Sequence, residues 1–224
     1  MKSIIILLAS VAAVAPAHAE IQAWDVITLM ARLDESGGPA GWVDLQLRRR
    51  GGSTQYLARP ALGWAFSPTL FAHVGYAWIP TAPDDGTYSS EHRVWQQALF
   101  NGTARPDLKY QVRARVEQRF GPGSGVGLRL RGLGRVQWQP SDRVPLQLVV
   151  WDELFVGLNE TTDFALQGFD QNRAFAGVGV DTAIKGLRVE AGYLHLLTQA
   201  GDRTDHVLGF FVTANTWLRA APGL

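Results

Sequence analysis

The chain has 224 residues, with 21 Lys and Arg against 20 Asp and Glu, and it contains no cysteine. The absence of cysteine excludes disulfide bonds, thiolate metal sites and thiol catalysis. A net charge of +1 argues against a nucleic-acid-binding protein, which normally carries a basic excess to neutralise phosphates. Eighteen of the basic residues are Arg, whose planar guanidinium suits forked ion pairs with carboxylates.

Residues 1–19 have the pattern of a secretory signal peptide. Lys2 gives a positive start, an apolar run covers 4–14, and Ala17-His18-Ala19 forms an A-x-A cleavage site. The run is too short for a transmembrane helix, which needs about 20 residues, and no second candidate follows. We therefore predict export, with cleavage after Ala19, and a mature domain over 20–224. The alternative, a hydrophobic helix of a cytoplasmic protein, leaves the A-x-A site unexplained.

Beyond residue 20 the sequence alternates between apolar and polar residues over long stretches. Over 108–120 the even positions are mostly apolar and the odd positions polar, and the same parity returns over 126–138 after a glycine-rich turn. This pair predicts a long hairpin with one apolar and one charged face. Further strands are expected over 21–32, 41–50, 54–66, 69–79, 90–100, 145–156, 169–181, 186–198 and 205–217.

The length of these strands favours a membrane barrel. They span about ten residues or more, whereas strands of soluble sandwiches typically have about 5 to 6, and a tilted strand needs about 9 to 11 to cross a bilayer. We expect an all-β fold, an antiparallel transmembrane β-barrel in the outer membrane of a Gram-negative bacterium, with lipid outside and charges inside. The alternative is a soluble periplasmic sandwich or barrel, whose apolar side chains face inward and whose charged side chains face outward. Aromatic residues near strand ends suit membrane girdles: Trp64, Phe66, Tyr76, Trp78, Phe120 and Trp138.

The number of strands conflicts with a general rule. Eleven strands are predicted, but bacterial single-chain outer-membrane barrels have even numbers. We therefore expect ten or twelve strands, with the error within 20–66. If the C-terminus is periplasmic, the longer connectors 80–89, 157–168 and 199–204 lie on the outer side, and short turns at 67–68 and 182–186 lie on the periplasmic side.

Several segments together resemble a known family. They are Glu91 to Gln97, Arg113 to Phe120, Asp152 to Phe155, Phe169 to Arg173 with Gly177 to Gly179, and Val189 to Leu194, supported by Arg59 to Gly63 and Gly75 to Trp78. Their order and spacing are similar to the bacterial family called domain of unknown function 2490. The resemblance implies an outer-membrane-like barrel and transfers no reaction, cofactor or partner.

The chain departs from that family pattern in two places. Residues 195–199 stand where the family pattern has a more polar strand end. Residues 217–224 lack the terminal aromatic residue of that pattern. The second departure weakens the usual C-terminal assembly signal, for which Phe211 and Trp217 are the remaining candidates. The expected partners are nevertheless outer-membrane lipids and the barrel-assembly machinery, with the barrel as a monomer.

The charged face supplies the candidate site. Two interpretations stay open: an ion network that fills a narrow lumen, or a narrow pore or pocket that prefers anions and takes a small anionic solute. The lumen candidates are Glu91, Arg93, Arg113, Arg115, Glu117, Arg119, Arg129, Arg131, Arg135, Glu153, Asn172, Arg173, Arg188 and Glu190.

Catalytic motifs are sparse. Four histidines follow the signal segment, without H-x-H or H-E-x-x-H spacing, so we expect no metal and no cofactor. Ser90 and His92 share one face of a predicted strand, as a lipid hydrolase would require of its nucleophile and base. A catalytic role is the alternative to a non-enzymatic barrel.

Overall fold

The structure is a computed structural model that describes residues 19–33, 37–123, 125–141, 143–164, 167–200 and 202–217. The predicted signal segment lies almost entirely outside these residues, as does the chain after Trp217. The all-β prediction is confirmed, and no helix of the described residues is long and apolar enough to cross a membrane. The strands are β1 (Ile21–Arg32), β2 (Gly38–Arg50), β3 (Ser53–Ala65), β4 (Leu70–Pro83), β5 (Ser89–Arg105), β6 (Leu108–Phe120), β7 (Gly127–Trp138), β8 (Leu146–Gly157), β9 (Gly168–Asp181), β10 (Leu187–Thr198) and β11 (Arg203–Trp217).

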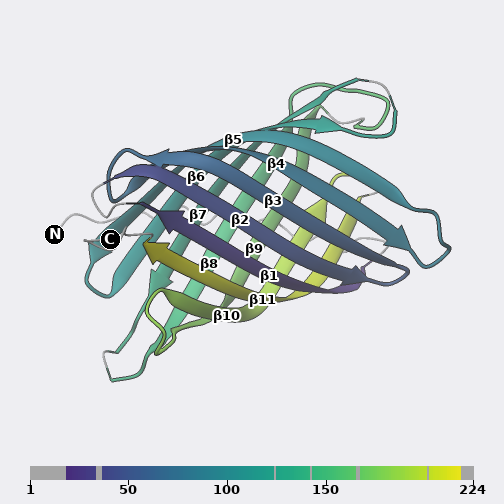
Figure 1. The fold of residues 1–224 in the computed structure, drawn as a ribbon. Helices are drawn as coiled ribbons and strands as arrows, with labels where there is room; N and C mark the ends of the chain where they lie inside the picture. Colours follow the sequence, from purple (N-terminus) through teal and green to yellow (C-terminus); the bar gives the residue numbers. More distant parts are fainter. Residues whose placement is uncertain are drawn as a thin grey trace.

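The strands form a closed barrel in which each pairs with its neighbour in the chain (Figure 1). These pairs are antiparallel, but β1 closes the barrel against β11 in parallel, from Ile21 opposite His206 to Arg32 opposite Trp217. The expectation of ten or twelve strands was therefore wrong. An even number is required only when every neighbouring pair is antiparallel, and one parallel pair lets eleven strands close. No strand within 20–66 needs to be removed.

The parallel closure gives the barrel two distinct ends. We call the end where β1 and β11 begin the N-terminal end, and the end where they finish the C-terminal end. The connectors 84–88, 158–167 and 199–202 lie at the N-terminal end, and 66–69 and 182–186 lie at the C-terminal end. This grouping matches the prediction. The connectors of the two ends differ less in length than expected, because the connector 139–145 at the C-terminal end is longer than the connector 199–202 at the N-terminal end.

The outer face of the barrel is apolar. Thirty-six large hydrophobic side chains of the described residues are exposed, twice the eighteen hydrophobic residues that are buried. All six aromatic residues predicted near strand ends are among the exposed ones. Trp64 and Trp138 lie near the C-terminal end, and Trp78 and Phe120 lie near the N-terminal end. Aliphatic side chains such as Val112 fill the band between these two groups.

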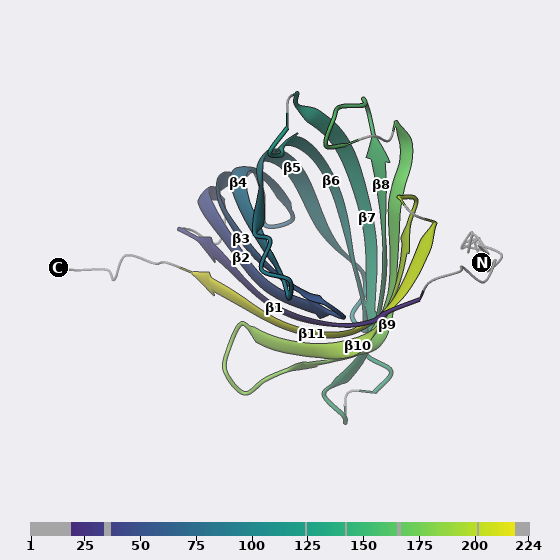
Figure 2. The ribbon, with the colours of Figure 1, turned by 90° about the vertical axis from the view of Figure 1, so that its right-hand side faces the viewer.

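The inner face carries apolar clusters as well as charges, which the sequence analysis did not anticipate. Figure 2 shows β1 to β4 and β7 to β9 on different sides of the curved wall. One cluster includes Trp42, Phe71 and Trp95 of β2, β4 and β5, and another includes Phe175 and Val149 of β9 and β8. Gly75 makes room for the first cluster, because a Cβ there would lie 2.3 Å from the Trp95 ring.

Candidate functional site

Two carboxylates on neighbouring parts of the wall organise the central ion network. Glu117 of β6 is fully buried and accepts hydrogen bonds from Arg129 Nε at 3.1 Å and from Arg131. Glu153 of β8 accepts from Arg131 Nε at 3.0 Å and from Arg113 Nη2 at 2.6 Å. The guanidinium of Arg131 therefore bridges the two carboxylates. Alternation in β6, β7 and β8 puts all these side chains on the inner face.

Two further carboxylates extend the network toward the two ends. Near the N-terminal end, Glu91 accepts from Arg93 Nε at 2.7 Å and from Arg119 Nε at 2.6 Å. Toward the C-terminal end, Glu190 accepts from both Arg135 and Arg188. Such charge-assisted pairs satisfy both charge and hydrogen bonding away from bulk water.

Two predicted lumen residues differ from this pattern. Arg115 is buried and donates to the Gln97 amide oxygen at 2.6 Å, while its nearest carboxylate oxygen, on Glu117, is 3.7 Å away. Asn172 does not face the lumen: it donates to both carboxylate oxygens of the outward-facing Asp152 at 3.0 Å. The prediction for Asn172 was wrong because its neighbour Arg173 faces inward, and successive strand residues face opposite sides.

Several lumen residues lie outside the predicted set. Asp44 and Arg59 form a buried ion pair at 2.8 Å, and Arg48 points into the same space. Asp170 accepts from Arg129 Nη1 at 2.9 Å. The sequence pattern indicates the facing of Asp44 and Arg48, because Trp42, Asp44, Gln46 and Arg48 occupy alternate positions of one predicted strand.

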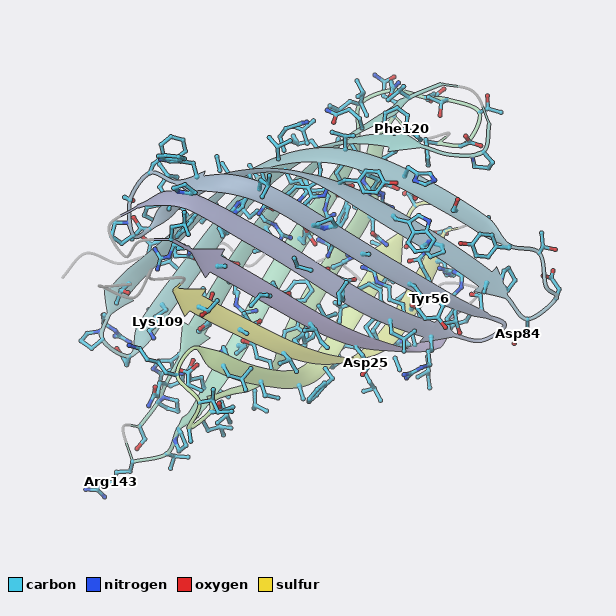
Figure 3. All side chains as sticks on the ribbon, viewed as in Figure 1. Asp25, Tyr56, Asp84, Lys109, Phe120 and Arg143 are labelled. Carbon is cyan, nitrogen blue, oxygen red and sulfur yellow. The ribbon has the colours of Figure 1, made fainter. Side chains whose placement is uncertain are left out.

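A cavity of about 680 Å³ occupies the lumen toward the C-terminal end. Its wall includes Pro68 and Ile184 from connectors of that end, and it reaches inward to Trp24 and Arg131. Figure 3 shows Lys109, another wall residue, at the same end as Arg143 and opposite Asp84 and Phe120. Eight basic residues line the cavity against four acidic ones: Arg48, Arg59, Lys109, Arg113, Arg131, Arg135, Arg173 and Arg188 against Asp44, Glu153, Asp181 and Glu190.

The lumen toward the N-terminal end is filled. Ile79, Phe155 and Val207 point inward there and are at most 1% exposed. The connector at 158–164 packs over this end, where Arg119 lies 3.9 Å from the centre of the Phe164 ring. Glycine at 127 is needed beneath that ring, because a Cβ would lie 2.4 Å from it. None of the side chains around Glu91 lines the cavity.

The serine and histidine considered for hydrolysis lie on β5, near the N-terminal end. The hydroxyl of Tyr76 is hydrogen-bonded to His92 Nδ1 on the outer face. Ser90 pairs with Pro80 of the neighbouring strand, and among the described residues no hydrogen bond joins Ser90 to His92. Within the described ranges, no three His, Asp or Glu side chains gather as metal ligands.

Comparisons with known proteins agree with the resemblance seen in the sequence. The family described as protein of unknown function DUF2490 matches residues 21–207. The chain belongs to this family. It is also 34% identical over 195 residues to an uncharacterized protein of Methylorubrum extorquens strain AM1, with 84% of each chain covered. No solved structure matches the chain.

Proposed function

We propose that this DUF2490 protein is a monomeric outer-membrane barrel with a blind lumen, which receives small anionic solutes in its cavity. The C-terminal end faces the periplasm in this proposal, so the cavity opens there and the filled half lies toward the cell surface. The proposed role is binding rather than catalysis. The barrel-assembly machinery and outer-membrane lipids are its expected partners.

The observation that carries the membrane assignment is the apolar outer face. Soluble monomers rarely expose a contiguous apolar patch above a few hundred Å². Here an aliphatic band runs between two groups of exposed aromatic residues, as in membrane barrels. Closure of the sheet satisfies the backbone hydrogen bonds that lipid cannot satisfy. The inward apolar clusters, which would also suit a soluble barrel, do not account for that band.

The basic excess of the cavity supports anion binding. Eight cations and four carboxylates line it, and Glu117 outside the wall compensates Arg131, so three positive charges remain in excess. Water or a bound anion must compensate them, because an uncompensated charge withdrawn from water costs several kcal/mol. Side chains at most 1% exposed point into the lumen beyond the cavity, which favours a receptor over a through pore.

The membrane assignment is tested by cell fractionation and by gel migration before and after boiling. The mature chain should fractionate with the outer membrane and migrate differently once boiled, because a folded barrel resists dissociation of its strands. Recovery of the whole protein in a detergent-free periplasmic extract would overturn the assignment. In planar bilayers the purified barrel should carry no steady current, whereas an anion-favouring current would restore the narrow channel as the function.

A further inference from the structure

We propose that the cavity binds an amphiphilic anion, a molecule with one carboxylate or phosphate head and an apolar body. This inference rests on the proposed function and names its ligand class. It follows from the apolar side chains that line the cavity among the charged ones, and from two guanidinium groups at its inner end that make no hydrogen bond to a carboxylate.

The head-group site is formed by Arg48 and Arg173. The Arg48 guanidinium lies 3.9 Å from the centre of a Trp24 ring, and its hydrogen bonds go to amide oxygens, including Gln46 Oε1 at 2.9 Å. Arg173 lies 4.9 Å from a Trp24 ring, and its nearest carboxylate oxygen, on Glu153, is 3.9 Å away. Arg173 is about nine-tenths buried, and its Nε has no hydrogen-bond partner among the described residues. An anion beside Trp24 would compensate both charges.

The apolar body would lie beside the head-group site, because Trp151 and Phe211 pack against the same apolar cluster as Trp24. Met30, Trp151 and Phe211 line the cavity from β1, β8 and β11. Trp151 and Phe211 meet edge to face, with ring centres 6.3 Å apart. The basic side chains of the cavity come from β2, β3, β6, β7, β9 and β10. A cavity of about 680 Å³ is within the usual range of about 300 to 1,000 Å³ for small-molecule sites. A bound inorganic anion would leave these apolar side chains in contact with water, whereas an apolar body would cover them.

The test uses 8-bromooctanoate with the mature barrel in phosphatidylcholine nanodiscs. Bromine quenches tryptophan fluorescence at contact, and Trp24, Trp42 and Trp151 line the cavity. We expect saturable quenching that unbrominated octanoate competes away, whereas octanol and inorganic phosphate compete poorly. Arg48→Gln should weaken binding by about tenfold or more, which corresponds to about 1.4 kcal/mol.

Arg49→Gln is the matched control. Arg49 is adjacent in sequence but pairs with Asp25, at 3.0 Å, with both side chains about half exposed. The Arg49→Gln variant should bind 8-bromooctanoate as tightly as the wild type does. Equal competition by octanol, or unchanged binding in Arg48→Gln, would overturn the ligand class and leave the membrane assignment intact. Recovery of the protein in the soluble periplasmic fraction would instead remove the proposed function, even if octanoate binding depends on Arg48.

A second, independent observation concerns the parallel seam between β1 and β11. Asp205 of β11 is fully buried and lies 2.9 Å from Arg203 Nε; it also accepts hydrogen bonds from the Glu20 backbone N at 3.2 Å and from Gln22 Nε2 at 2.7 Å. We infer that cleavage of the predicted leader adds a second cation to Asp205, beside Arg203, and so stabilises the seam. Hydrolysis of the Ala19–Glu20 peptide bond consumes one water, leaves a carboxylate on Ala19 and gives Glu20 an α-ammonium group.

The added ion pair is tested on refolded barrels that begin either at Glu20 or at Ala19. The Glu20 form should unfold at a higher temperature in the gel-migration assay, because its ammonium group lies beside Asp205. Asp205→Asn should abolish the difference in unfolding temperature between the two forms, however much it destabilises each of them. Equal unfolding temperatures in the Asp205 background, or a difference that survives in Asp205→Asn, would overturn the inference.

Discussion

The two halves of the lumen are built from the same strands but differ in how completely their charges are matched. In the filled N-terminal half, Glu91 and Glu117 bind Arg93, Arg119 and Arg129 at hydrogen-bond distances, and apolar side chains occupy the remaining space. In the C-terminal half, cations outnumber carboxylates by two to one around an open cavity.

This difference distinguishes arginines that stabilise the fold through ion pairs from arginines that can bind a ligand. A buried guanidinium stabilises a fold only when its carboxylate is close and both are fully hydrogen-bonded. Where water has access, unmatched guanidiniums are tolerated and remain available to a ligand. The surplus of Arg expected from the sequence is therefore concentrated around the cavity, and Arg115, whose nearest carboxylate oxygen is 3.7 Å away, is an exception outside it.

The largest expected effect comes from removing the central carboxylate of the network. Glu117→Gln leaves Arg129 in the filled half and Arg131 at the cavity wall facing a neutral amide, and breaking such a buried pair costs about 3–5 kcal/mol. Asp181→Asn is the control in the open half, since Asp181 is 56% exposed beside Arg188 and should cost about 0–1 kcal/mol. Unfolding in urea, followed by gel migration, measures both. Equal losses would mean that the two halves do not differ in hydration.

The next effect tests whether lipid surrounds both halves. Val112 lies within β6 on the outer face, and Arg there should destabilise the barrel by about 2–4 kcal/mol if it lies near the bilayer midplane. Leu128 is the second residue of β7, near the N-terminal end, so Arg there should cost about 0–1 kcal/mol. The same urea assay in lipid vesicles compares the two variants. A negligible cost for Val112→Arg would place its side chain in water.

Labelling of single cysteines maps the boundary between the halves, and the chain has no native cysteine to interfere. Thr213 lines the cavity, whereas Ile79 is 1% exposed in the filled half. A water-soluble maleimide should modify Thr213→Cys readily and Ile79→Cys only as fast as the barrel opens. Mass spectrometry of timed samples gives both rates. Similar rates would indicate water along the whole lumen and favour the channel.

The sequence predicted the strands and their facing but not how the lumen is divided. Period-two patterns are local, so they located all eleven strands and the inward parity of β6 and β7. The parallel closure pairs Ile21 with His206, and no local pattern reports such a distant contact. The inward facing of Asp170 was missed for a related reason. A bulge between β8 and β9 leaves Asp170 as an extra residue, so parity cannot be carried across it.

The smallest expected effect is that of Ser90→Ala. A hydrolytic pair needs its serine hydroxyl within hydrogen-bond reach of the histidine, with a third group orienting the imidazole. Here His92 Nδ1 is hydrogen-bonded to the Tyr76 hydroxyl, and Ser90 lies opposite Pro80. We therefore expect Ser90→Ala and His92→Gln to leave octanoate binding and any phospholipid turnover by the purified barrel unchanged. Turnover that both variants abolish would replace the blind receptor with a lipid hydrolase working on the outer face, away from both halves of the lumen.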